Sequence, residues 1–163
     1  MFTTIETTGS SLQRVIWKAW PWVNWFLPAV LLAAYILSGS AGWEGVLLLY
    51  VWPGVIPALS LLSSIPRFVL RRAGWRVAPR VIVGLLIAQW AAALLFTATA
   101  RGTTDGAELP SMLGNVFGIP EAAEVALNIG FLVIVVLAWI ATVVVPVGSV
   151  AKSRRGTPSN HAN

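Results

Sequence analysis

Residues 122–148 read AAEVALNIGFLVIVVLAWIATVVVPVG and carry a single ionisable side chain, Glu124. A membrane-spanning helix needs about 20 mostly apolar residues, because each residue adds about 1.5 Å along the axis. Three further stretches meet this requirement. The sequence therefore predicts an all-α fold with four transmembrane helices in an antiparallel bundle, at about residues 22–38, 43–62, 81–100 and 122–148.

The composition indicates that most of the chain is surrounded by lipid. Hydrophobic residues make up 57% of the 163 and charged residues only 10%, whereas soluble domains carry about 25% charged residues. An ordinary cytosolic enzyme is therefore excluded. We expect one membrane domain at residues 1–150 and a polar, disordered cytoplasmic tail at 151–163.

The basic residues predict the orientation. Ten of the eleven lie in the N-terminal arm, the loop at 63–80 and the tail: Arg14, Lys18, Arg67, Arg71, Arg72, Arg76, Arg80, Lys152, Arg154 and Arg155. These segments share one side of a four-span protein, which the positive-inside rule makes the cytoplasm. We expect a multi-pass protein of the cytoplasmic membrane with both termini inside. The excess of arginine over lysine is typical of a bacterium with a GC-rich genome.

The net charge of +5 is explained by orientation and by anionic lipid, so we expect no nucleic-acid partner. Four arginines of the second loop are candidate contacts to lipid headgroups: Arg67, Arg71, Arg72 and Arg76.

Two segments outside the spans are amphipathic. Residues 11–20 predict a short helix on the inner leaflet or a docking surface, which Pro21 should separate from the first span. The charges ahead of the first span would also suit a signal peptide, but the long apolar run and its tryptophan cluster favour a retained anchor. Residues 110–120 predict a short helix or re-entrant turn at the outer interface.

Tryptophans fall into two groups. Trp17, Trp20, Trp22 and Trp25 predict an aromatic belt at the headgroup level. Trp52 and Trp90 should lie near the midplane, where Gln89 has a similar depth. Their indole N–H groups need acceptors, so we expect interhelical hydrogen bonds or, alternatively, a platform for a ligand such as a quinone.

The second span contains the break Trp52-Pro53-Gly54-Val55-Ile56-Pro57, which predicts a plain kink or a binding site. On the third span, Gly84, Ala88 and Ala92 form a small-residue face that another helix could approach. Asn24, Gln89 and Asn128 are polar residues expected to join helices. The candidate helix-packing or ligand-lining residues are Trp52, Pro53, Gly54, Pro57, Gly84, Ala88, Gln89, Trp90 and Asn128.

Ionisable residues lie only at the ends of the spans. Glu44 and Glu124 should cap helix N-termini and reach water, and Arg101 should pair with Asp105, Glu108 or Glu124. The chain has no Cys, and its single His, His161, lies in the tail. We therefore expect no metal, no haem or other cofactor, and no catalytic triad.

These observations favour a non-catalytic integral membrane protein that serves as an accessory or interaction subunit beside other membrane proteins. The alternative is a small homo-oligomeric transporter or channel with a site near the Pro53/Gly54/Pro57 break. A membrane-embedded enzyme is a third hypothesis, but no catalytic residues support it.

Overall fold

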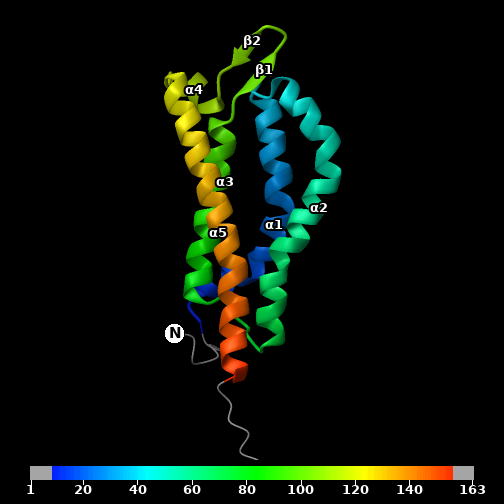
Figure 1. Ribbon diagram of the computed structural model, residues 1–163, viewed down its shortest axis with the longest axis vertical. Coiled ribbons are helices and arrows are strands. Elements are labelled where there is room, and N and C mark those ends of the chain that lie inside the picture. The colour runs from blue at the N-terminus through cyan, green and yellow to red at the C-terminus, as the bar shows by residue number, and fades with distance from the viewer. Residues whose placement is uncertain (1–8, 156–163) are drawn as a thin grey trace, which may run out of the picture.

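The computed structural model describes residues 9–155, and four long helices run along its long axis (Figure 1). They are α1 (Ser11–Leu37), α2 (Gly42–Arg72), α3 (Arg80–Thr99) and α5 (Glu121–Arg155). Strands β1 (Gly102–Thr104) and β2 (Ala107–Leu109) and the short helix α4 (Met112–Phe117) lie between α3 and α5. All four long helices are long and apolar enough to cross a membrane. The prediction of a mostly helical chain with four candidate spans is confirmed.

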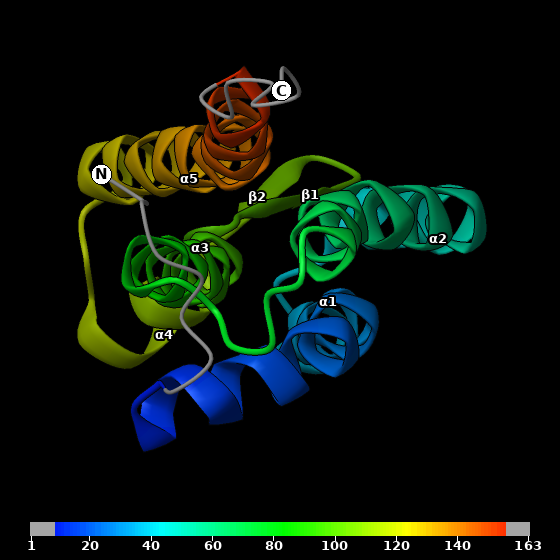
Figure 2. The same ribbon diagram turned by 90° about the horizontal axis from the view of Figure 1, so that it is seen from below.

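Helix α1 does not end at Pro21, so the predicted separation of residues 11–20 from the first span is wrong. Pro21 and Pro28 both lie inside one continuous helix, which begins at a capping box formed by Ser10 and Gln13. The chain bends instead, and the first turns of α1 lie across the long axis while the rest runs along it (Figure 2). A proline kink is tolerated in such a helix when neighbouring helices satisfy the freed backbone groups.

Helix α2 continues ten residues beyond the predicted end of its span at Leu62 and reaches Arg72. It contains Pro53, Pro57 and Pro66, and its middle bows away from α1 (Figure 1). Each proline removes one backbone hydrogen bond and kinks the helix axis. Arg67, Arg71 and Arg72, expected in a loop, are therefore on the last turns of a helix.

The long helices form a ring in the order α1, α2, α5, α3 (Figure 2). Helices α3 and α5 are in the most extensive contact, and each also contacts one helix of the α1–α2 pair. Because α5 runs to Arg155, residues 151–155 of the expected disordered tail are helical. Residues 156–163 lie outside the described part of the chain.

The end where α2 stops and α3 begins, here called the arginine end, contains Arg67, Arg71, Arg72, Arg76 and Arg80. It also holds the main apolar core, formed by Ile16, Trp20, Leu70, Trp75, Ala78, Ile82, Val83 and Leu86. Trp20 is fully buried in this core, so its assignment to an aromatic belt is wrong. Trp22 and Trp25 are exposed, as lipid-facing side chains would be.

The opposite end, here called the hairpin end, carries an antiparallel β-hairpin that was not predicted. Gly102 pairs with Leu109 and Thr104 with Ala107, so Asp105-Gly106 forms the two-residue turn. Gly106 has a φ of 103°, a conformation that favours glycine. The Asp-Gly dipeptide is the sequence signal for such a turn, although short polar strands flank it here.

Candidate ligand cavity

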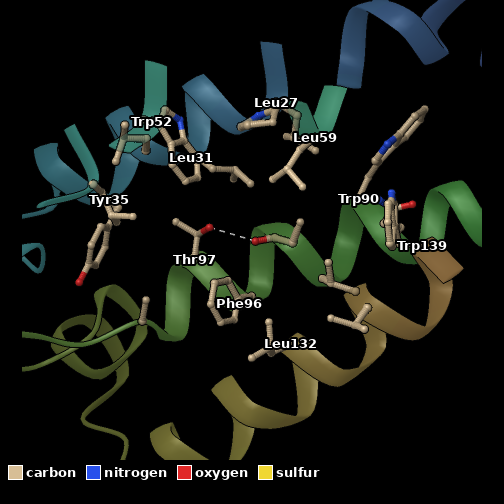
Figure 3. A pocket seen from close by; sticks show the side chains of 18 of the residues that line it. Leu27, Leu31, Tyr35, Trp52, Leu59, Trp90, Phe96, Thr97, Leu132 and Trp139 are labelled. Atoms are coloured by element: carbon tan, nitrogen blue, oxygen red, sulfur yellow. Dashed lines mark hydrogen bonds between the residues drawn. The ribbon is translucent and has the colours of Figure 1, made fainter. Parts of the chain in front are cut away.

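A cavity of about 740 Å³ lies between the four long helices (Figure 3). Tyr35 lies at one end of it and the rings of Trp90 and Trp139 at the other, with Leu31, Phe96 and Leu132 between them. Its lining comes from α1, α2, α3 and α5, and most of it is aliphatic or aromatic. Ligand sites typically enclose about 300–1,000 Å³ and have mainly apolar walls with a few polar groups, so this cavity has the dimensions of a binding site.

Hydrogen bonds from neutral side chains, to other side chains or to backbone carbonyls, join all four long helices at the end of the cavity nearer the arginine end. We call this set the indole–amide layer; it consists of Trp20, Asn24, Ser60, Ser63, Trp90 and Trp139. Asn24 lies at its centre, because its Nδ2 donates to the Ser63 carbonyl (3.3 Å) and its Oδ1 accepts from Trp90 Nε1 (3.4 Å). Trp139 Nε1 of α5 donates to Ser63 Oγ (3.0 Å).

A proline explains one further bond of this layer. Pro28 has no N–H, so the carbonyl of Asn24, four residues earlier, lacks its usual partner within α1. Ser60 Oγ of α2 donates to that carbonyl over 2.8 Å and is itself buried. The kink in α1 thereby creates an acceptor that a neighbouring helix satisfies.

At the hairpin end, carboxylate side chains surround Arg101, the only basic residue that the structure describes there. The guanidinium donates to Glu108 (2.8 Å) and to Glu124 (3.0 Å), and Glu121 lies 3.7 Å away. Ser111 Oγ donates to the second oxygen of Glu124. We call these five residues the hairpin-end charge cluster.

Glu124 is only 1% exposed, so the expectation that it reaches water is wrong. A Cβ at Gly114 would collide with the Glu124 carboxylate, so the glycine leaves the space that this side chain occupies. The predicted pairing of Arg101 with Glu108 or Glu124 is confirmed for both residues. Asp105 is not among the described ion-pair partners of Arg101; its carboxylate accepts from Trp43 Nε1 (2.9 Å).

Hydrogen bonds hold the β-hairpin and the preceding Arg101 against the end of α1 and the start of α2. The Glu44 carboxylate accepts from the backbone N–H (2.8 Å) and the hydroxyl (2.7 Å) of Thr103, and Tyr35 Oη donates to the Arg101 carbonyl (2.8 Å). A side chain at Gly42 would collide with the Thr103 backbone. Glu44, Tyr35 and Arg101 also line the cavity, so these contacts connect the β-hairpin to its second end.

Two polar groups on the cavity wall are unpaired. The Nε1 atom of Trp52 is buried and has no hydrogen-bond partner, and the Gln89 side chain has none among residues 9–155. Each lies ten residues from the hairpin-end terminus of its helix, which is about 15 Å along the axis. The predicted interhelical bond exists for Trp90, but its acceptor is Asn24 rather than Gln89.

The structure separates the predicted site residues into two sets. Trp52, Gln89, Trp90 and Asn128 line the cavity, and Asn128 also joins α5 to α3 through the Phe96 carbonyl (2.9 Å). The others do not line it: Pro53, Gly54, Pro57, Gly84 and Ala88. Pro53 and Gly54 are exposed on α2, next to the wall residue Trp52.

Three residues of the indole–amide layer were not predicted from the sequence: Ser60, Ser63 and Trp139. Their signal was present, because serines and an indole on membrane helices often hydrogen-bond across to other helices, but the partners lie 36 to 76 residues apart along the chain. Within the described residues, no three His, Cys, Asp or Glu side chains are grouped to hold a metal ion. No family model, curated protein or solved structure matches the chain.

Proposed function

We propose that this chain is a non-catalytic, multi-pass membrane protein that binds an elongated apolar molecule of the membrane in its cavity. The observation that carries the proposal is a space of about 740 Å³ walled by apolar side chains from four helices. Left empty, such a space would deprive its lining of dispersion contacts. Water would fill it poorly, because water needs two to four polar partners and apolar cavities stay dry or take up apolar guests.

The unpaired groups narrow the class of ligand. Trp52 Nε1 is a donor without an acceptor, and Gln89 offers both a donor and an acceptor. A ligand that carries an ester or ketone oxygen part-way along an apolar chain could accept hydrogen bonds from the Trp52 indole N–H and from the Gln89 amide N–H. An acyl lipid or a quinone has this chemistry, and a fully saturated hydrocarbon does not.

The proposed orientation in the cytoplasmic membrane places both termini inside. Every arginine of the arginine end would face the cytoplasm under the positive-inside rule, in an antiparallel bundle whose first turns of α1 rest at the inner interface. The chain has no cysteine, so single cysteines report sidedness cleanly. Thr104→Cys should react with an impermeant maleimide outside intact cells, and Arg76→Cys should react only after lysis. The reverse pattern would contradict the orientation.

Filling the cavity tests the function. Ala93 lines the cavity on α3, whereas Ala91 on the same helix is exposed and does not line it. Purified wild type and Ala91→Trp should each retain about one co-extracted lipophilic molecule per chain, counted by native mass spectrometry, because the cavity volume admits one such ligand. Ala93→Trp should retain almost none. Equal retention by both variants would exclude the cavity as the binding site.

A carrier that moves its ligand across the bilayer is the second candidate. The Pro53/Gly54/Pro57 break beside Trp52 favours it, because interrupted helices often flank transporter sites. Reconstituted protein should then speed the exchange of a labelled lipophile between leaflets, and Ala93→Trp should abolish that increase. The role as an accessory subunit of a larger membrane complex stays a prediction, which co-purification after gentle extraction would test.

A further inference from the structure

The arginine end contains a guanidinium whose surroundings are incomplete. Arg67 on α2 is partly buried, and its carbon Cζ lies 5.1 Å from the centre of the Trp17 ring on α1. Its Nε atom is buried and has no hydrogen-bond partner. A buried donor on a charged group loses its hydration without compensation, so an acceptor at the terminal Nη atoms would stabilise this guanidinium.

A second positive charge close to Arg67 adds to its lack of compensation. Arg71 lies one turn further along α2, a spacing that puts both guanidinium groups on one side of the helix, where like charges repel. The described carboxylates are all on residues of the hairpin end: Glu44, Asp105, Glu108, Glu121 and Glu124. None of these residues can neutralise Arg67 or Arg71 across the length of the bundle.

We propose that Arg67 and Arg71, with Trp17 as a stacking platform, form a discrete site for the phosphate of an anionic phospholipid. A guanidinium presents its donors in a fork that matches two phosphate oxygens, and one phosphate can bridge two arginines. The Trp17 ring lies against the Arg67 guanidinium, and because Nε is buried, the phosphate would bind the terminal Nη atoms. The site is separate from the cavity, so it does not rest on the proposed function.

The surroundings favour a lipid headgroup over a soluble anion. Ile65, Phe68 and, on the first turns of α1, Val15 are exposed apolar side chains near this end. They would contact the acyl chains of a lipid whose phosphate lies at Arg67. Arg72 and Arg76 differ, because Arg72 stacks on Phe68 of its own helix (4.4 Å) and Arg76 is exposed. Of the four candidate headgroup arginines, only Arg67 has a buried, unpaired donor.

Arg76→Gln is a matched control for Arg67→Gln, because each substitution removes one positive charge from the same end. The full chain is purified in detergent with equal amounts of phosphatidylglycerol and phosphatidylcholine, and bound lipids are counted by native mass spectrometry. Wild type and Arg76→Gln should hold one phosphatidylglycerol selectively. Arg67→Gln should bind it roughly tenfold more weakly, because a charge-assisted fork is lost. Equal weakening in both variants would overturn the site in favour of diffuse attraction.

One further variant and one competing ligand distinguish a bidentate lipid site from the alternatives. Arg67→Lys preserves the charge and loses the fork, so it should bind phosphatidylglycerol more weakly than wild type while its unfolding temperature stays unchanged; wild-type affinity would overturn the bidentate site. Glycerol 1-phosphate supplies the headgroup phosphate without acyl chains and should not displace the bound lipid. Displacement by glycerol 1-phosphate would contradict the lipid as the source of the phosphate.

Discussion

Two polar networks lie at the two ends of the cavity, and they use different chemistry. The hairpin-end charge cluster is ionic, with Arg101 held by carboxylates of which Glu108 and Glu121 are about 60% exposed (59% and 64%). The indole–amide layer is neutral throughout and lies well inside the candidate spans. An ionised side chain costs little free energy where water reaches it and a great deal within hydrocarbon. The chain thus places its ion pairs at the hairpin end, and it uses indole, hydroxyl and amide groups to join the helices within the candidate spans.

The largest expected effect is in the ionic network. Glu124→Gln removes the buried carboxylate that Arg101 and Ser111 both contact, and breaking a buried ion pair by removing one partner costs about 3 kcal/mol. Thermal unfolding in detergent should show this loss. Glu121→Gln is the matched control and should cost under about 1 kcal/mol, because its side chain is exposed and lies 3.7 Å from Arg101. Similar losses in both variants would mean that burial of Glu124 has no special role.

The next effect separates a structural amide from a ligand-binding one. Asn24→Leu removes two hydrogen bonds of the indole–amide layer and should destabilise the protein by about 1–2 kcal/mol. Gln89→Leu makes the same kind of change on the cavity wall, where no hydrogen bond is lost, and should change stability by less than about 0.5 kcal/mol. Ligand retention should fall for Gln89→Leu. A stability loss as large as that of Asn24→Leu would make Gln89 structural.

A smaller effect than that of Asn24→Leu tests how Pro28 shapes the indole–amide layer. Ser60→Ala removes the donor to the Asn24 carbonyl and should cost about 0.6 kcal/mol. In a Pro28→Ala background, the restored N–H can bond to that carbonyl within α1. Ser60→Ala should then cost nothing further, and unfolding measurements on the four variants give this coupling. Additive costs would show that Ser60 does not replace the missing helical bond.

The sequence predicted the four spans because hydropathy accumulates locally over about 20 residues. It missed the extension of α2, because Ser63, Ser64 and Arg67 lower the hydropathy although the helix continues to a buried Leu70. It could have identified the β-hairpin from Asp105-Gly106.

The site was harder to predict than the fold. Trp52, Gln89 and Trp90 were predicted from depth alone, and their roles depend on neighbours distant in sequence. Asn24 accepts from Trp90 66 residues away, and no local pattern specifies that pairing. The cavity itself arises from the bow of α2 and from the packing of four helices, which a pattern of residues along one helix does not encode.

The most direct test of the ligand cavity compares two adjacent positions on α3. Phe96 lines the cavity, whereas Leu95 is exposed and does not line it. A photoreactive benzoylphenylalanine at each position is irradiated in native membranes, and the adduct on the purified chain is weighed by mass spectrometry. We expect one dominant lipophilic adduct at position 96 and a mixture resembling the bulk lipid at position 95. The same bulk mixture at both positions, or no adduct at 96, would contradict this expectation.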